Sequence, residues 1–409
     1  MSDDLTRRDF LRTGAIVALG LAAPPWLAQI ARADVLRLSK GGKIDPDNIL
    51  VVCQFSGGND GLNTLIPWSD AEYRRLRPSL GVAADSVLKL DESMGLHPAM
   101  DGVFQLFKSG NAAIVQGVGY PNPNRSHFRS MEIWQTANPD KPEQYGWLGR
   151  YLDDQQQKGS ANPVVAIELN RNKSAALKAK NASVPCFASL ADIQSLLGDP
   201  DSERILREIQ ANDAPSGSDS RAVQMATKSA LDAMSELNKS VGNYKSTYTY
   251  GSDQFGQAFK QVAQLIATSP KTRIVYIAGG GFDTHSRQAG QHEALLKGFS
   301  AAIKTFMDEM SSLGKAKKVT VMVFSEFGRR AAENASGGTD HGAAAPMFLF
   351  GGNLKGGLVG PNPDLANLER GDVKWHTDFR QVYATILDQW MGADSATLFG
   401  KSFEHVAVF

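Results

Sequence analysis

Several apolar runs along the chain have the length of β-strands and end in turn-forming or polar residues. The run at 49–55 is continuously apolar, which is the pattern of a parallel strand covered on both faces of a sheet. Shorter or more mixed runs follow it, and we interpret them as further strands at 112–118, 163–169, 184–187, 273–278, 318–324 and 346–350.

Between these runs, apolar residues recur at the spacing of amphipathic helices. Such segments lie between Pro98 and Gly110 and at 127–137, 254–268, 291–313 and 378–390. Strands that alternate with helices indicate an α/β fold with a doubly wound, mostly parallel sheet flanked by helices. We predict a single domain over 34–409, with a mainly helical insertion at about 191–241.

The first residues predict a targeting signal that is not part of the fold. The motif TRRDFLR at 6–12 has paired arginines and precedes the modestly apolar run GAIVALGLAA, and Ala31-Arg32-Ala33 is typical of a cleavage site. This apolar segment is interrupted by Pro24 and Pro25 and is too short to span a bilayer. We therefore predict a twin-arginine signal peptide at 1–33, recognition by the twin-arginine export machinery, and a periplasmic or secreted protein with no stable membrane span.

Composition narrows the choice of partners. The 409 residues include 42% hydrophobic and 21% charged residues, as in an ordinary globular protein, and Lys+Arg 43 balances Asp+Glu 43. Without net charge there is no electrostatic reason to predict a nucleic-acid partner. Two cysteines do not make a disulfide scaffold, and whether Cys53 and Cys186 pair is left open.

Three polar clusters accompany neighbouring strands in the C-terminal half. GGGFDTH follows the strand at 273–278, SEFGRR follows the strand at 318–324, and GGTDHG leads into the strand at 346–350. Strand ends of an open α/β sheet share one edge, so acidic and histidine side chains scattered in sequence are expected to converge there. Such ligands suit zinc, manganese or iron. The candidate metal ligands in these clusters are Asp283, His285, Glu326, Asp340 and His341, with Arg329 as a candidate anion-binding residue.

Two segments in the N-terminal half add to this candidate site. Asp60 lies in the glycine-rich turn SGGNDGLN directly after the first strand, although a plain turn is the better explanation of that segment taken alone. Ser126 stands at the expected N-cap of the helix HFRSMEIWQTA, where a nucleophile and a helix cap are compatible functions. Arg125 and His127 place positive charge on either side of it.

The motifs resemble those of an exported bacterial family called domain of unknown function fifteen-oh-one. The resemblance covers nearly the whole mature chain and rests on the signal and seven further motifs: GGNDGLNTLIP, LHPAM, NRSHFRSMEIWQTA, GFDTH, SEFGRR, GGTDHG and HTDFRQVYATIL. That family is grouped by fold with the alkaline phosphatase, sulfatase and cofactor-independent phosphoglycerate mutase superfamily. The resemblance therefore implies an alkaline-phosphatase-like fold.

The superfamily also implies roles for particular residues. Asp60 would be the first acid and Ser126 the nucleophile, with Glu326 joining Asp60 on one of two metal ions. Asp283, His285 and His341 would hold the other ion. The sequence departs from the superfamily pattern, because Glu326-Phe327 stands where an Asp-His pair is expected. Asp340-His341 supplies that pair elsewhere, so His341 on the first ion, or Asp340 and His341 both on the second, remain alternatives, as do one ion or two.

Two functions are the main candidates, and a third, an oxidoreductase accessory factor, is suggested only by the export route. The first is an exported metal-dependent hydrolase of phosphate or sulfate esters, acting on a small-molecule or polymer substrate, in which Ser126 attacks and Arg329, Arg125 and His127 assist. The second is a non-catalytic binding or assembly protein with a degenerate site and a protein partner, which Glu326-Phe327 favours. A dinucleotide-binding fold is disfavoured, because no G-x-G-x-x-G follows the first strand.

Overall fold

The computed structural model describes residues 44–159, 162–192 and 244–409, with scattered positions between 201 and 237. Residues Asp47–Phe409 form one compact unit. The predicted signal at 1–33 and most of the predicted insertion at 191–241 lie outside the described residues. Among the helices that the structure describes, none combines the length and apolar character that a membrane span requires.

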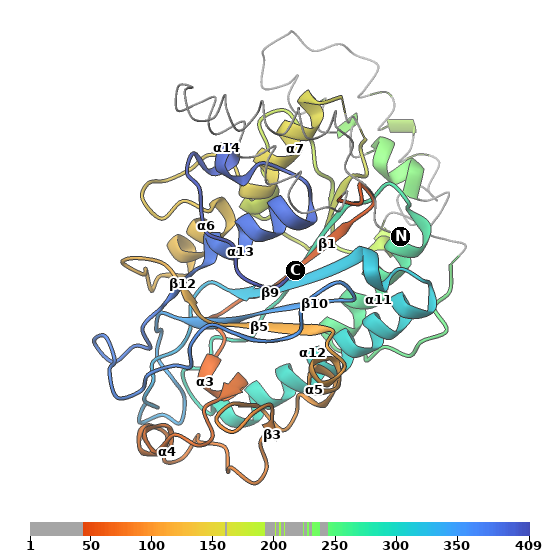
Figure 1. The fold of residues 1–409 in the computed structure, drawn as a ribbon. Coiled ribbons are helices and arrows are strands. Elements are labelled where there is room, and N and C mark those ends of the chain that lie inside the picture. The colour runs from red at the N-terminus through yellow and green to blue at the C-terminus, as the bar shows by residue number, and fades with distance from the viewer. Residues whose placement is uncertain are drawn as a thin grey trace, which may run out of the picture. The chain divides into compact units, whose positions relative to one another are not determined.

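Nine strands of the described chain form one mostly parallel sheet, in the order β11-β5-β10-β9-β1-β8-β6-β7 with β12 beside β5 (Figure 1). The central strand β1 pairs in parallel with β8 and with β9, whereas β10 is antiparallel to both β9 and β5. The strands are β1 Ile49–Phe55, β5 Ala112–Gly119, β6 Ala166–Leu169, β7 Cys186–Phe187, β8 Ile274–Gly279, β9 Val319–Ser325, β10 Ala345–Gly351, β11 Gly357–Val359 and β12 Thr377–Asp378.

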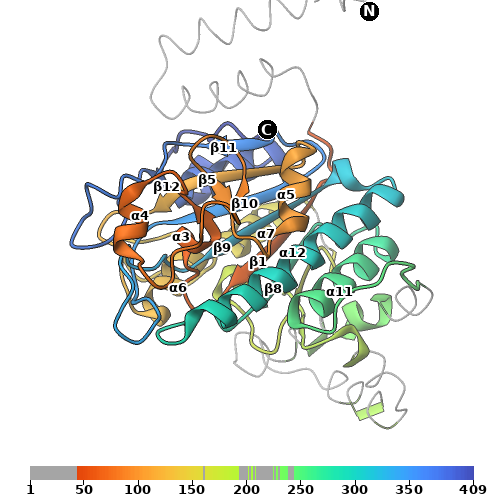
Figure 2. The same ribbon diagram turned by 90° about the horizontal axis from the view of Figure 1, so that it is seen from below.

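Helices cover both faces of this sheet, with α5, α11 and α12 on one face and α6, α7 and α13 on the other (Figures 1 and 2). Side chains of β1 alternate between the two cores: Val51 and Cys53 face the first, and Leu50 and Val52 the second. The doubly wound prediction is thereby confirmed. The helices are α5 Asp101–Lys108, α6 His127–Thr136, α7 Trp147–Gln157, α11 Gln254–Thr268, α12 Gln288–Ser312, α13 Phe379–Thr385 and α14 Ser395–Phe399.

A smaller module follows β1 and carries the turn that contains Asp60. It consists of a three-stranded sheet in the order β2-β4-β3 and two short helices. Its elements are α3 Gly61–Thr64, β2 Leu65–Ile66, α4 Ala71–Leu76, β3 Leu88–Lys89 and β4 Gly95–Leu96. We did not predict this module, because its strands are only two residues long and show no periodicity.

Element boundaries differ from the predictions in a few places. The strand predicted from Pro163 begins only at Ala166, since proline has no N–H to donate to a sheet ladder. The last predicted helix, 378–390, is α13 followed by a π-helical turn at Ile386–Trp390. Helix α7 was not predicted. Both cysteines carry free thiols, and Cys53 is buried in β1.

Glu168 gives the fold a specific dependence on pH. Its side chain is buried in β6, where the Ser174 N–H donates to both carboxylate oxygens at 2.9 and 3.0 Å. Burial raises the pKa of Glu168 to about 7. A raised folded-state pKa means that the protonated acid stabilises the fold at low pH, and that this contribution is lost as the pH rises through 7. As the pH rises from the unfolded-state pKa past the folded-state pKa, this contribution to the free energy of unfolding falls by roughly 3 kcal/mol.

Glu168→Gln is therefore expected to gain stability relative to the wild type as the pH rises from about 4 to about 8. Urea unfolding of both proteins across this range measures the change in their stability difference, which should approach about 3 kcal/mol. A stability difference that stays constant with pH would show that Glu168 titrates normally in the folded protein.

Candidate metal centre

Three polar clusters on two loops meet at one edge of the sheet. The loop after β8 carries Asp283 and His285, and the loop after β9 carries Glu326. His341 precedes β10, and because β10 is antiparallel to β9, its beginning lies at the edge where β9 ends. Arg329 and His341 also form an isolated β-bridge that holds the two ends of the β9–β10 loop together.

The glycine-rich turn after β1 lets these loops approach closely. Gly57 and Gly58 both have positive φ, at 122° and 78°. A Cβ on Gly57 would lie 2.4 Å from the Asp283 amide nitrogen, and one on Gly58 would lie 2.3 Å from the Phe327 ring. The turn therefore requires glycine for packing as well as for backbone conformation.

Three potential metal-ligand atoms form a nearly equilateral triangle. Nε2 of His285 lies 2.9 Å from Nε2 of His341, and these nitrogens lie 3.0 and 3.1 Å from Oδ1 of Asp283. Ligand atoms around a tetrahedral zinc ion with bonds of about 2.0 Å are separated by roughly 3.3 Å, so the triangle has the size of one face of such a site.

Hydrogen bonds on the far side of each ring determine which nitrogen faces the triangle. Nδ1 of His341 contacts the Arg125 carbonyl oxygen at 2.8 Å, and since a carbonyl only accepts, Nδ1 carries the proton. Nδ1 of His285 faces Asp340 at 3.3 Å. The hydrogen bond from Asn334 lowers the pKa of Asp340, so this carboxylate is also an acceptor.

When both rings are neutral, the two Nε2 atoms consequently present lone pairs to each other and to a carboxylate oxygen. Acceptor atoms about 3 Å apart repel one another unless a cation lies between them. Neutral imidazole and carboxylate are ligands of zinc, manganese and iron, and histidines oriented through Nδ1 are typical of metal sites. The donor set of Asp283, His285 and His341 thus fits a divalent metal.

His127 lies beside the triangle and is oriented by Glu326. Its Nδ1 contacts Oε1 of Glu326 at 2.8 Å, and this hydrogen bond is the main cause that raises the pKa of His127. Its buried Nε2 has no hydrogen-bond partner among the described residues and lies 3.4 Å from Oδ2 of Asp283. His127, Asp283 and His341 can place one donor atom each within 4.8 Å of one another.

Glu326 was predicted as a metal ligand, but in the structure its carboxylate oxygens accept hydrogen bonds from other groups of the protein. Its side chain is almost fully buried, and Oε1 accepts the Gly57 N–H at 2.8 Å as well as the contact with His127. Oε2 accepts the Ser325 hydroxyl at 3.1 Å. We therefore interpret Glu326 as the carboxylate that orients His127 and not as a ligand.

Asp283 is ionised at all physiological pH values. Partial burial raises the pKa of Asp283, but the hydrogen bond and the positive charge of Arg329 outweigh this effect and lower the pKa to about 2. The side chain is still 47% exposed, so the full negative charge faces the open side of the cluster.

Arg329 lies behind the cluster, and a direct contact with substrate does not fit its position. Its side chain is fully buried, and each guanidinium nitrogen donates to oxygen. The acceptors are Asp283 and the backbone carbonyls of Gly57, Gly58, Phe282 and Thr339. Arg329 therefore ties the loops after β1, β8 and β9 to one another.

Asp60 is not brought into the cluster. It is fully buried, and Oδ2 accepts from Arg77 at 2.5 Å and from Gln288 at 2.5 Å. Burial raises the pKa of Asp60, but the charge and hydrogen bond of Arg77 reverse the shift and leave the pKa below its usual value. Among the described residues no contact joins Asp60 with Glu326, so the implied second ion at these two acids does not fit the structure.

Ser126 lies at the exposed rim of the cluster. It occupies the N-cap position of α6 as predicted, but its hydroxyl does not cap the helix, so this group is left for other partners. Its two neighbours both touch the site: the Arg125 carbonyl holds His341, and the His127 ring packs 4.4 Å from the His341 ring. The Arg125 guanidinium is paired with Asp372.

Two contributors were missed from the sequence. The Phe327 ring is buried and packs against His127 and His341, with ring centroids 4.9 and 4.6 Å apart, so it forms the apolar wall of the site. We noted Phe327 only as a departure from the superfamily pattern. Asp372 gave no signal, because its loop contains no motif that we linked to the site.

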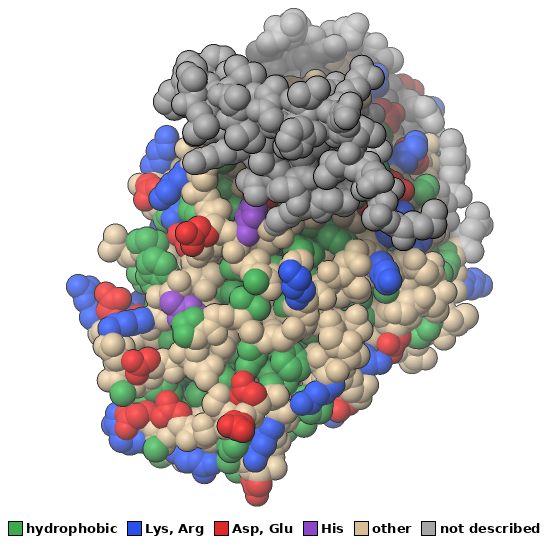
Figure 3. Space-filling model, viewed as in Figure 1, with side chains coloured by type: hydrophobic (Ala, Val, Ile, Leu, Met, Phe, Trp, Pro, Cys, Tyr) green, Lys and Arg blue, Asp and Glu red, His purple; other side chains and the backbone are tan. Residues whose placement is uncertain are grey.

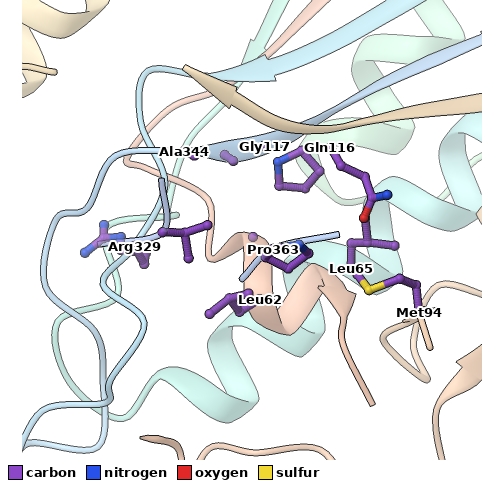
Figure 4. Close-up of a pocket in the computed structure, with 12 residues that line it drawn as sticks. Leu62, Leu65, Met94, Gln116, Gly117, Arg329, Ala344 and Pro363 are labelled. Atoms are coloured by element: carbon purple, nitrogen blue, oxygen red, sulfur yellow. The ribbon is translucent and has the colours of Figure 1, made fainter. Parts of the chain in front are cut away.

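A separate, shallow open pocket lies between α3, β5 and β10 (Figure 4). Its lining is mainly apolar, with Leu62, Leu65, Met94 and Pro363 among the residues, and Gln116 as a buried polar group. Arg329 also lines it, but the donors of Arg329 are used elsewhere. We therefore place the candidate functional site at Asp283, His285 and His341 and not at this pocket.

The surface agrees with the balanced charge of the sequence. On the face shown in Figure 3, acidic and basic side chains are interspersed. A mixed surface of this kind offers no extended field of one sign to attract a polyanion.

The fold and the site together define an α/β protein with two imidazoles and a carboxylate, groups that can bind a metal ion, at the edge of a doubly wound sheet. The chain belongs to the family described as "Protein of unknown function (DUF1501)", whose family model matches residues 47–405. No curated protein matches the sequence.

Solved structures resemble the chain at the level of the fold alone. The C-terminal periplasmic domain of EcEptC from Escherichia coli, solved in complex with Zn, is 7% identical with a TM-score of 0.37, covering 76% of this chain and 75% of that one. A protein in the alkaline phosphatase superfamily from Vibrio parahaemolyticus is 10% identical with a TM-score of 0.37, covering 87% and 70%. The PsFucS1 sulfatase from Pseudoalteromonas sp. is 11% identical with a TM-score of 0.35, covering 93% and 72%. Such scores carry no argument about residues or activity.

Proposed function

We propose that this protein is a metal-dependent hydrolase of phosphate or sulfate esters. The observation that carries the proposal is the triangle formed by Nε2 of His285, Nε2 of His341 and Oδ1 of Asp283. Three protein donors on one side with an exposed opposite side are typical of catalytic sites, whereas structural sites are closed by four.

A divalent ion bound there would lower the pKa of a neighbouring hydroxyl and neutralise charge on the ester oxygens. Ser126 lies at the rim, its hydroxyl has no hydrogen-bond partner among the described residues, and it stands beside the first backbone N–H groups of α6, which favour anions. Its Oγ would form a bond to phosphorus or sulfur while the alkoxide of the ester leaves. Water would then hydrolyse the seryl ester and release phosphate or sulfate.

The test is elemental analysis of the folded protein purified without chelator, followed by a screen of aryl phosphates and aryl sulfates. We expect about one equivalent of zinc, manganese or iron, and turnover of one ester class that a chelator abolishes. A folded protein that neither contains nor takes up metal would refute the proposal.

Ser126→Ala separates the nucleophile from the metal. Metal content is expected to stay at the wild-type level, because Ser126 is not among the donors, whereas ester turnover should fall by roughly a hundredfold or more. Ser86→Ala is the matched control, since Ser86 is an exposed serine in another loop. Turnover by Ser126→Ala at the wild-type rate would exclude a seryl intermediate.

A specific observation favours a second function. Asp60 is neutralised by Arg77, and Glu326 is committed to His127, so the two-ion arrangement implied by the family resemblance is not assembled. A protein that binds metal and a ligand or protein partner without turnover would also have this site. Stoichiometric metal with no turnover of any ester would favour that function.

A further inference from the structure

We propose that Asp372 is a positioning residue of the metal centre: it anchors Arg125, and the backbone carbonyl of Arg125 fixes the ring of His341. This inference rests on the proposed metal site and adds a residue that lies on a different loop. The chain of contacts runs from a carboxylate through a guanidinium and a peptide group to a metal-ligand histidine.

The first step of the argument is the link between Arg125 and His341. The Arg125 carbonyl accepts from Nδ1 of His341 at 2.8 Å, which sets both the tautomer and the direction of Nε2. The same peptide segment continues into Ser126 and His127. The placement of Arg125 therefore affects one ligand ring directly and two further site residues through the backbone.

The second step is the anchor itself. The Arg125 guanidinium donates to Oδ2 of Asp372, whose side chain is only 4% exposed, whereas that of Arg125 is 36% exposed. The other oxygen, Oδ1 of Asp372, is buried and has no hydrogen-bond partner among the described residues. The carboxylate of Asp372 is thus buried, which is unfavourable for a charged group. Its one side-chain hydrogen bond in the described structure is the one to Arg125.

The third step is the rigidity of the loop that holds Asp372. Its backbone exchanges hydrogen bonds with Glu369 at 2.9 and 3.0 Å, which closes a tight turn. The Gly371 carbonyl accepts the Ala331 N–H at 3.2 Å, so the turn is tied to the loop between β9 and β10. A carboxylate fixed in this way can hold the segment at 120–126 in register with His341.

Loss of such an orienting contact typically weakens metal binding by about 10- to 100-fold. The experiment measures the affinity of the folded protein for Zn²⁺ by competition with a chromophoric chelator, for the wild type, Asp372→Asn and Arg125→Ala. Asp372→Asn should weaken Zn²⁺ binding at least tenfold. Glu132→Gln is the matched control, because Glu132 pairs with Arg129 on the same helix as His127 and its loss changes the net charge equally.

Arg125→Ala separates anchoring from simple electrostatics. Removing a positive charge near a cation site should tighten Zn²⁺ binding if charge alone matters, whereas the anchor predicts weaker binding. The double variant Asp372→Asn/Arg125→Ala should bind Zn²⁺ no more weakly than the single variant with the lower affinity, because both substitutions break the same Arg125–Asp372 contact. Arg125 is partly exposed, so this variant tests the inference even where Asp372→Asn fails to fold.

The outcomes distinguish between failure of the positioning function of Asp372 and failure of the proposed metal site. Weaker Zn²⁺ binding in both single variants, with Glu132→Gln unchanged, supports the positioning function. Unchanged binding in Asp372→Asn, or tighter binding in Arg125→Ala, overturns the positioning function while leaving the metal site intact. A wild-type protein that binds no metal would overturn the proposed function itself.

Discussion

His341→Ala is expected to lose its metal and with it nearly all ester turnover. The substitution removes one corner of the triangle. It also removes the ring that packs against Phe327, His127 and His285. Loss of a ligand should cost several kcal/mol of transition-state stabilisation, which is roughly a thousandfold in rate. Elemental analysis and turnover of an aryl ester measure the two effects separately.

The matched control is His405→Gln, because His405 contacts Asp388 and Gln389 instead of the cluster. It should keep both metal and activity. The double variant Asp283→Ala/His341→Ala should retain no metal at all. Full activity in His341→Ala would contradict the proposed mechanism, since His341 lies at the centre of the contacts that define the site.

Arg77→Met is expected to produce the largest loss of stability. Arg77 is buried beside Asp60, and it also donates to Asn63 and to the carbonyls of Ala331 and Arg330. Removing its charge leaves the Asp60 carboxylate buried without its counter-ion, and breaking such a pair typically costs about 3–5 kcal/mol. Urea unfolding measures the loss as a lower midpoint at unchanged slope.

Two comparisons make this prediction specific. Arg77→Met/Asp60→Asn should recover part of the lost stability, because the uncompensated charge is then absent. Arg75→Met, two residues earlier in α4, should change stability far less, since Arg75 is 65% exposed and its ion-pair partner in the described structure is the partly exposed Glu72. Equal losses from Arg75→Met and Arg77→Met would show that the Arg77–Asp60 pair has no special importance.

The sheet could be predicted largely from the apolar runs. Strands buried on both faces leave continuous apolar segments, and β1, β8, β9 and β10 lie where those runs predicted them. The direction of β10 could not be predicted, because hydrophobic pattern does not distinguish a parallel from an antiparallel neighbour. The edge shared by the three polar clusters was nevertheless expected, and the structure brings Asp283, His285 and His341 together there.

The functions of single charged residues were harder to predict. Asp60, Glu326 and Arg329 all stand in motifs after strands, and nothing in the motifs shows that each is buried against a partner. Asp60 meets Arg77 from the small module, and Glu326 meets His127 from α6. Such partners come from segments far apart in sequence, so a charged residue at a strand end can be a ligand, an orienting group or half of a buried pair.

The position of β1 at the centre of the sheet bears on how the chain is synthesised. Leu50 pairs with Ile274 and with Thr320, so β1 is synthesised more than two hundred residues before the strands that pair with it. At typical rates of translation this delay is on the order of ten to fifty seconds, during which an apolar strand has no native partner. Folding of the sheet is therefore expected to be largely post-translational and slow, and the nascent chain is expected to depend on chaperones.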